Sequence, residues 1–124
     1  MGSYALPGDG VSRARTANNY ANSLLSLRHF EEAKALLRKT MPVAQRVLGE
    51  SHETMLNMRW LYAAALSKST GATLNDIREA ATTLEETERT ARRVLGSAHP
   101  LTKIIERNLR IVQDLVNRQG LSKK

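Results

Sequence analysis

One short motif occurs twice in this chain and constrains its fold more than any other feature. Residues 47–52 read Val-Leu-Gly-Glu-Ser-His, and residues 94–99 read Val-Leu-Gly-Ser-Ala-His, 47 positions later. A second correspondence has an offset of 42, because residues 19–24 (Asn-Tyr-Ala-Asn-Ser-Leu) align with residues 61–66 (Leu-Tyr-Ala-Ala-Ala-Leu). Internal repeats of about 20 to 50 residues are typical of helical repeat arrays. The sequence therefore predicts a repeated helical unit.

The composition suits helices that pack on other helices. Apolar residues make up 41% of the 124 positions and charged residues 25%, which is ordinary for a globular domain. Aromatic residues contribute only 4%, and most of the apolar content is Leu, Ala, Val and Ile. The chain has no cysteine, which excludes disulfides, thiolate metal sites and a cysteine nucleophile.

Charge and hydropathy give a first indication of partners and location. The net charge of +7 favours acidic partners. The longest apolar run, residues 61–66, is far shorter than the ~20 residues that a membrane span requires. No secretory signal pattern is present near Met1. We therefore expect a cytoplasmic (intracellular) protein with no membrane contact.

Apolar periodicity and helix-capping signals predict five helices. Gly49 and Gly96 are expected to end the second and fourth helices in the left-handed conformation, and Pro100 to begin the fifth. The expected helices span residues 12–27, 30–48, 53–69, 74–95 and 100–118. The residues expected to face inward are Ala17, Tyr20, Ala21, Leu24 and Leu27; Ala33, Leu36, Leu37, Val43 (or Ala44) and Val47; Leu56, Trp60, Tyr62 (or Ala63) and Leu66; Ile77, Ala80, Ala81, Leu84, Ala91 and Val94; and Ile104, Ile105, Leu109, Val112, Leu115 and Val116.

These helices are expected to form successive antiparallel pairs. The chain divides into a tag remnant and irregular lead (1–11), a first unit (12–49), a second unit (50–96), a closing helix (97–118) and a basic tail (119–124). A five-residue insertion in the turn of the second unit, near Gly71, changes the offset from 42 to 47. Each pair leaves an apolar face that the next pair covers, so the expected fold class is an all-α solenoid.

The repeated residues resemble the tetratricopeptide repeat, in the 42-residue form found in kinesin light chains. That form has a linker of the type L-G-x-x-H-P-x-T, then N-L-A-x-x-L, then G-x-Y-x-E-A. The chain has the linker at residues 48–53 and 95–100, the second element at residues 19–24 and the third at residues 28–33. Arg28 stands where the family has the turn glycine, and Leu61 replaces the asparagine. The resemblance implies a right-handed α-solenoid of about two repeats plus a closing fifth helix.

The resemblance also implies a protein–protein interaction scaffold whose concave face is lined by the first helix of each pair. Amide donors, cations and an aromatic ring on that face suit an extended peptide with an acidic side chain or a C-terminal carboxylate. Trp60 has a second interpretation, as a core residue between repeats, whereas Tyr20 and Tyr62 are both expected in the core. The expected peptide-binding residues are Arg15, Asn18, Asn22, Asn57, Trp60, Lys68 and Arg107, with Ser26, Ala64 and Ile111 as further groove-facing positions.

We expect no catalysis, no metal and no cofactor. His52 and His99 occupy equivalent linker positions, where the start of a helix would use their side chains as caps. Neither has a carboxylate or a second histidine at ligand spacing. The adjacent pair Glu31 and Glu32 points to different helix faces, which is poor geometry for joint acid–base catalysis.

Two other interpretations stay open. Six cations in the second half could attract nucleic-acid phosphates, although aromatic residues for base stacking are scarce. An array with uncovered end faces could also be a purely structural module that forms a homodimer. The six cations are Arg89, Arg92, Arg93, Lys103, Arg107 and Arg110.

Overall fold

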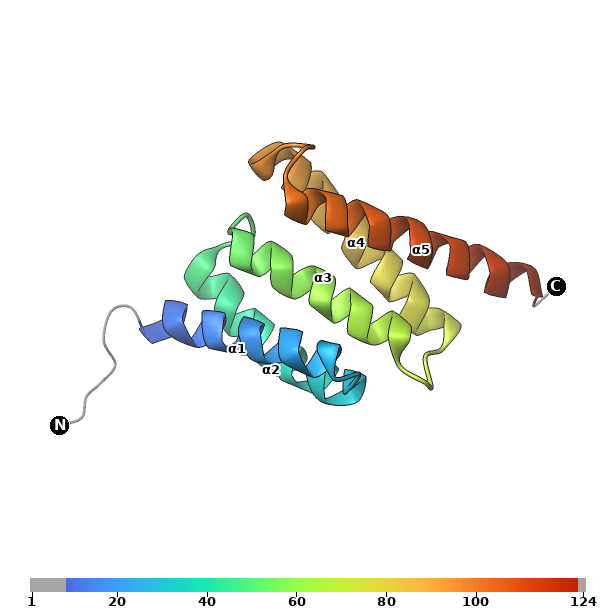
Figure 1. Cartoon of the computed structure of the whole chain (residues 1–124), viewed down its shortest axis with the longest axis horizontal. Helices are drawn as coiled ribbons and strands as arrows, with labels where there is room; N and C mark the ends of the chain where they lie inside the picture. The colour runs from blue at the N-terminus through green and yellow to red at the C-terminus, as the bar shows by residue number, and fades with distance from the viewer. Residues whose placement is uncertain (1–8, 123–124) are drawn as a thin grey trace.

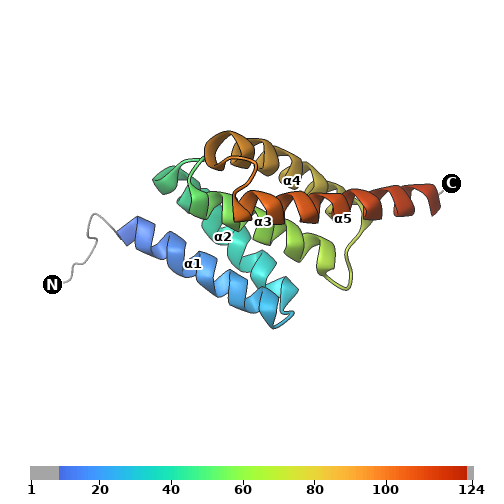
Figure 2. The same ribbon diagram turned by 45° about the horizontal axis from the view of Figure 1, so that its top comes forward.

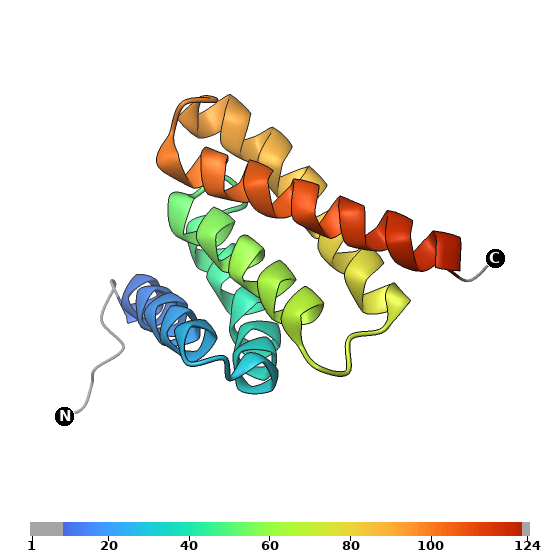
Figure 3. The ribbon, with the colours of Figure 1, turned by 45° about the vertical axis from the view of Figure 1, so that its right-hand side comes forward.

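The computed structural model describes residues 9–122, which form five α-helices in two layers (Figure 1). Helices α1, α3 and α5 form one layer, and α2 and α4 lie behind it (Figures 1 and 3). Each helix packs against the next along the chain, and α3 also contacts α1 and α5. The expected all-α solenoid of antiparallel helix pairs is confirmed. The helices are α1 (Asp9–Ser26), α2 (Phe30–Leu48), α3 (Glu53–Lys68), α4 (Leu74–Leu95) and α5 (Pro100–Ser122).

Both outer helices are longer than the sequence indicated. The expected start of the first helix at residue 12 is wrong, because α1 begins at Asp9. Gly10 lies inside α1, and a Cβ there would lie 2.9 Å from Val47 Cγ2, so glycine lets α1 approach the end of α2. The expected tail from residue 119 is also helical, and α5 runs to Ser122. The rest of the lead and tail lies outside the described residues.

The helix caps follow the sequence signals. His52 Nδ1 accepts the Thr54 backbone N–H at 3.0 Å, and His99 Nδ1 accepts that of Leu101 at 3.0 Å, so both linker histidines are N-caps. A capping box joins Thr73 and Asp76 at the start of α4. Gly49 and Gly96 have the expected positive φ, at 87° and 93°. Their ψ values of 161° and 157° are extended, so the expected left-handed helical conformation is wrong. Only glycine enters that region without strain.

Helix α3 forms the centre of the core. The other four helices all contact it, and nine of its 16 residues are buried, from Met55 to Leu66. A helix that is apolar on nearly every side is expected only where neighbours surround it. Both Tyr62 and Ala63 are buried, whereas Trp60 is half-buried against the core. The periodicity argument missed Met55, Met58 and Leu61, since it assumed a polar face that α3 does not have.

Four residues expected in the core are exposed. Leu27 follows the last residue of α1 and lies in the turn, where no described helix covers it. Val47 and Val94 occupy equivalent positions near the ends of α2 and α4, with exposed fractions of 44% and 42%. Tyr20 is 54% exposed because α1 has no described helix on its outer side. In α2, Ala44 and not Val43 is the buried alternative.

Tyr62 joins three helices at the junction between the two repeats. Its hydroxyl accepts a hydrogen bond from Arg38 Nε in α2 at 3.1 Å and donates one to Glu79 Oε2 in α4 at 3.1 Å. The Arg38 guanidinium also lies 5.9 Å from the centre of the Tyr62 ring. The hydrogen bond to Tyr62 raises the pKa of Arg38. The phenol therefore adds charge-assisted hydrogen bonds to an apolar interface.

Replacement of Tyr62 tests this junction. We expect Tyr62→Phe to lower the free energy of unfolding by about 1–2 kcal/mol, because both charged partners lose a hydrogen bond while the ring stays. The matched control is Tyr20→Phe, 42 positions earlier on an exposed face, which should change stability by less than about 0.5 kcal/mol. Urea denaturation followed by circular dichroism measures both. Equal losses in the two variants would contradict a special role for the junction.

The histidine caps make a second prediction. His99→Ala should cost about 1 kcal/mol of stability, because the Leu101 N–H loses its acceptor at the start of α5. His99→Asn should restore most of that loss, since asparagine is a strong N-cap residue. Thermal unfolding of the three proteins is the measurement. An asparagine variant as unstable as the alanine variant would show that His99 acts by another contact.

Candidate functional site

Helices α1, α3 and α5 lie on the same side of the molecule (Figure 2). This layer has two open hollows. The first, which we call the turn hollow, has a volume of about 600 Å³ and lies between the end of α1 and the end of α3. The second, the linker hollow, has a volume of about 620 Å³ and lies where α3 and α5 begin. The turn hollow is lined by Asn22, Leu25, Ser26, Arg28, Phe30, Trp60, Leu61, Ala64 and Lys68. The linker hollow is lined by Arg15, Asn18, His52, Glu53, Thr54, Asn57, His99, Pro100, Leu101 and Ile104.

A short hydrogen-bond chain connects the two hollows. Asn57 Nδ2 donates to Asn18 Oδ1 at 2.7 Å, which joins α3 to α1. Trp60 Nε1 in turn donates to Asn57 Oδ1 at 2.8 Å. The indole N–H is therefore satisfied inside the protein, and only the ring surface of Trp60 is left to meet a ligand. Trp60 packs on the core and also lines the turn hollow, and its role as a ligand-contacting residue stays a prediction.

Six of the seven candidate site residues line one of the hollows. Asn22, Trp60 and Lys68 line the turn hollow, together with the further candidates Ser26 and Ala64. Arg15, Asn18 and Asn57 line the linker hollow. Arg107 is exposed on α5 and lines neither, and the same holds for Ile111. The structure thus divides the candidates into two groups and leaves Arg107 apart.

Arg28 also lines the turn hollow, although the sequence argument did not select it as a candidate. The His29 N–H bonds to the Leu24 carbonyl at 2.8 Å and the Arg28 N–H to that of Leu25 at 3.0 Å, which is a Schellman motif with Arg28 at the position usually held by glycine. Its φ of 64° is positive, as in the left-handed helical region, which costs a non-glycine residue about 1 kcal/mol. The signal was present, because the family has glycine at this turn position.

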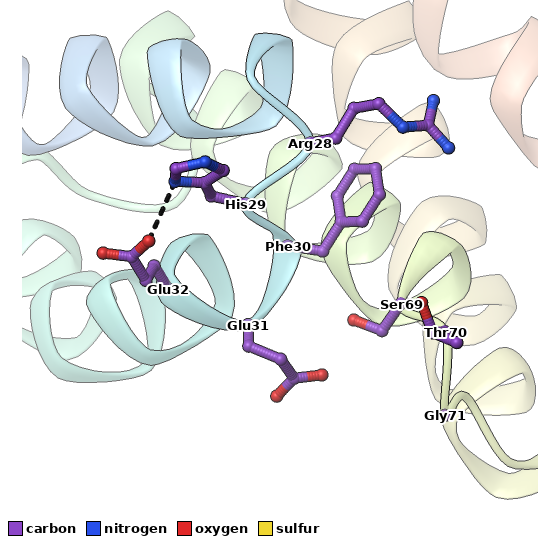
Figure 4. Close-up of a pocket in the computed structure, with 8 residues that line it drawn as sticks. All are labelled: Arg28, His29, Phe30, Glu31, Glu32, Ser69, Thr70 and Gly71. Atoms are coloured by element: carbon purple, nitrogen blue, oxygen red, sulfur yellow. Dashed lines mark ion pairs between the residues drawn. The ribbon is translucent and has the colours of Figure 1, made fainter.

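The Arg28 side chain is placed by a ring contact. Its guanidinium lies 5.6 Å from the centre of the Phe30 ring (Figure 4). Arg28 and Phe30 separate the turn hollow from a third hollow of about 410 Å³, which also includes His29, Glu31 and Glu32. Cation–π contacts of this kind stabilise by about 0.5–1 kcal/mol at exposed sites. The Phe30 ring therefore stabilises the Arg28 guanidinium at the edge of the turn hollow.

Positive charge dominates the turn hollow. Its lining contains Arg28 and Lys68 and no carboxylate. Two acidic side chains line the neighbouring third hollow, where Glu32 pairs with His29 at 2.9 Å (Figure 4). Glu31 is held by Lys34 at 3.1 Å, and the hydrogen bonds from Lys34 and then Ser69 lower the pKa of Glu31. Both carboxylates are therefore paired with basic side chains of their own segment.

The linker hollow has mixed charge. It includes Arg15 and Glu53, and the two capping histidines have committed their Nδ1 atoms to backbone N–H groups. His99 Nε2 lies 3.9 Å from Glu53 Oε2. Within residues 9–122, no three potential metal ligands of the His, Asp and Glu types come together. No helix in the same range is both long enough and apolar enough to cross a lipid bilayer.

The comparison with known families identifies the repeat. Residues 13–54 match the tetratricopeptide repeat family, and this segment of 42 residues, about a third of the chain, covers most of α1, all of α2 and the first two residues of α3. The chain therefore contains a tetratricopeptide repeat at residues 13–54. No curated protein and no solved structure matches it. Tetratricopeptide repeats are non-catalytic and generally mediate protein–protein interaction. The matched segment includes Arg15, Asn18, Asn22 and Arg28.

The basic residues of the second half of the chain, which lies outside the matched segment, are interleaved with carboxylates. Arg92 Nε lies 2.6 Å from Glu88, and its other end pairs with Glu106. Glu106 also lies 3.9 Å from Lys103. Arg89 and Arg93 line an open hollow that also contains Glu50 and Glu86. Ion pairs of this kind reduce the attraction that a cluster of cations exerts on phosphates.

The strain at Arg28 can be measured. Arg28→Gly should raise stability by up to about 1 kcal/mol, because glycine adopts positive φ without a Cβ clash. Arg28→Ala keeps the unfavourable φ and loses the contact with Phe30, so it should be no more stable than the parent chain. Urea denaturation of the three proteins compares them. A glycine variant less stable than the alanine variant would mean that the backbone at residue 28 is unstrained.

Proposed function

We propose that this module binds an extended, acidic peptide segment of a partner protein on the face of α1, α3 and α5. The turn hollow takes an acidic side chain or a C-terminal carboxylate of that segment. The observation that carries this proposal is the lining of the turn hollow, where two cations and an amide border an apolar floor without any carboxylate. Small, partly apolar sites with a few placed polar groups are the usual form of a binding pocket.

The polar groups of the turn hollow are available to a ligand. Neither Asn22 nor Lys68 has a hydrogen-bond or ion-pair partner among residues 9–122. The Arg28 guanidinium lies over the Phe30 ring and keeps a planar set of donors that fits a carboxylate in bidentate fashion. Charge-assisted hydrogen bonds to a carboxylate are about twice as strong as neutral ones. The three side chains together can bind one carboxylate.

The rest of the peptide has a path along the same face. Leu25, Leu61 and Ala64 give the turn hollow an apolar floor, and the Trp60 ring stands beside it. Asn18 and Asn57 line the linker hollow, where the amide N–H groups of Asn18 can donate hydrogen bonds to a peptide backbone. An extended peptide that runs from the turn hollow to the linker hollow therefore meets apolar and polar groups in alternation, which provides specificity beyond charge.

Arg28 supports the same conclusion from its backbone. A strained φ at a non-glycine residue is found at functional sites more often than elsewhere. At this turn the side chain brings a cation to the edge of the hollow, at the cost of about 1 kcal/mol of stability. Glycine would remove that cost together with the cation. The arginine is thus better explained by binding than by folding.

A peptide library tests the proposal. We expect immobilised peptides of about 12 residues, which extend over about 40 Å, to be selected for Asp and Glu. Trp60 is the only tryptophan, so its emission should change on binding, and the affinity should fall as salt is raised. Lys68→Glu should weaken binding at least tenfold, which corresponds to about 1.4 kcal/mol. The control is Lys39→Glu on α2, which makes the same charge change outside the hollow and should leave the affinity within about twofold.

Two results would count against the proposal. One is a set of selected peptides without acidic enrichment, and the other is equal weakening by Lys39→Glu and Lys68→Glu. A random oligonucleotide measured over the same salt series serves as the competing ligand. Tight oligonucleotide binding with a steep salt dependence and no peptide signal would support the nucleic-acid interpretation instead.

A further inference from the structure

The hollow that contains Arg89 and Arg93 lies apart from the proposed peptide site. It has a volume of about 500 Å³ and lies where the loop after α2 meets α3 and the second half of α4. It shares no lining residue with the turn hollow or the linker hollow. We call it the arginine hollow, because three of its six lining side chains are arginines. It is lined by Glu50, Arg59, Glu86, Arg89, Thr90 and Arg93.

Arg59 has a buried donor that the protein does not satisfy. The side chain is half-buried on α3, and its Nε atom is buried without a hydrogen-bond partner among residues 9–122. Within the same range, the guanidinium bonds only to Gln45 Oε1, from Nη2, at a long 3.5 Å. A buried donor without a partner destabilises a fold, and native structures rarely keep one. A ligand that brings an acceptor into the arginine hollow would account for it.

The junction between α4 and α5 has an ion pair at the equivalent place. With the offset of 47 residues, Arg59 aligns with Glu106 and Gln45 aligns with Arg92. Glu106, whose side chain is 13% exposed, pairs with Arg92, and Lys103 lies 3.9 Å away. The half-buried charge is therefore neutralised between α4 and α5. Between α2 and α3, the half-buried cation has no counter-ion among the described residues.

Two more guanidiniums border the same hollow. Arg89 and Arg93 are exposed, and neither forms an ion pair or a hydrogen bond within residues 9–122. Because they are four residues apart, they lie on the same side of α4, one turn from each other. Arginines from α3 and α4 are therefore brought to one hollow of about 500 Å³.

Two carboxylates limit what the arginine hollow can bind. Glu50 accepts a hydrogen bond from Gln45 at 3.4 Å, and neither Glu50 nor Glu86 forms an ion pair in the described part of the chain. Three arginines against two glutamates leave the lining with a net charge of +1. The next cation along α4, Arg92, is already paired with Glu88 and Glu106. This arrangement favours one compact anion over a polyanion, whose further charges would meet the carboxylates.

We propose that the arginine hollow binds a phosphorylated serine or threonine side chain of a partner protein. A phosphoryl group of this kind has a charge of about −1.5 to −2 at pH 7 and three acceptor oxygens. Planar guanidiniums bind phosphate oxygens in bidentate fashion, and the Arg59 Nε–H gains the acceptor that it lacks. A carboxylate has less charge and only two oxygens, so it satisfies fewer of the three guanidiniums. This site is independent of the proposed acidic-peptide site.

A pair of matched peptides tests the proposal. One is a short alanine and glycine peptide with a single phosphoserine, and the other has glutamate in its place. Each is titrated to about 1 mM, a range that detects weak binding, into the full chain labelled with ¹⁵N. We expect the phosphoserine peptide to shift the Arg59 Nε–H signal and the backbone amides of residues 89–93. It should bind at least about fivefold more tightly than the glutamate peptide, since its charge is larger.

Variants of the hollow separate a built site from general charge attraction. Arg59→Met keeps the length of the side chain and should weaken phosphoserine binding at least tenfold, with no loss of stability, because it removes an unpaired buried donor. Arg93→Gln, at an exposed position, should also weaken binding. Its control is Arg78→Gln, which removes the same charge from α4 outside the hollow and should leave the affinity within about twofold. Glu86→Gln should strengthen binding several-fold, because it removes a like charge.

Several results would overturn the proposal. Among them are no shift at about 1 mM, shifts confined to Asn22 and Lys68 of the turn hollow, and equal affinities for the phosphoserine and glutamate peptides. Equal weakening by Arg93→Gln and Arg78→Gln would show that only overall charge matters. Binding of inorganic phosphate without binding of the peptide would reduce the hollow to a small-anion site. A random oligonucleotide that binds there more tightly than the peptide, with a steep salt dependence, would assign the hollow to nucleic acid.

Discussion

Helix α3 contacts all four other helices, and nine of its 16 residues are buried. By comparison, three residues of α2 and five of α4 are buried. The removal of the apolar surface of α3 from water is therefore a main favourable term in folding. Tyr62 adds the polar part of the same interface through Arg38 and Glu79. Both hollows are built on α3, because Trp60 lines one and Asn57 lines the other, so the site depends on the core directly.

The polar face between the hollows follows from this arrangement. Since α3 uses most of its surface for the core, it has few polar side chains, and two of them, Asn57 and Lys68, line the hollows of the open face. Asn57 is bonded to Asn18 and Trp60 within the protein, which fixes the middle of the face. Lys68 and Asn22 remain without partners among residues 9–122, and Arg28 is held over Phe30. A preformed, partly apolar hollow with a few polar or charged side chains at its edge is a common form of ligand-binding site.

Much of the architecture could be predicted from local signals. The linker histidines, Gly49 and the Thr73–Asp76 box mark helix ends by their own chemistry, and the repeat offset gives the order of packing. The surroundings of each helix could not be predicted in the same way. Tyr20 and Tyr62 are equivalent in sequence, but only Tyr62 has a described helix over it, and α3 lacks the polar face that periodicity arguments require. In the sequence, Arg28 stands out only because the family has glycine at this position. Its proposed role could not be predicted, because that role depends on the turn geometry and on the contact with Phe30.

The most direct test of the account locates a bound peptide on the surface. An acidic peptide selected for binding carries a photo-crosslinking residue next to its acidic side chain, and mass spectrometry identifies the attachment sites on the full chain. The account predicts crosslinks within residues 22–30 and 60–68, which border the turn hollow. Crosslinks concentrated on the outer sides of α2 and α4, with none on α1 or α3, would contradict it.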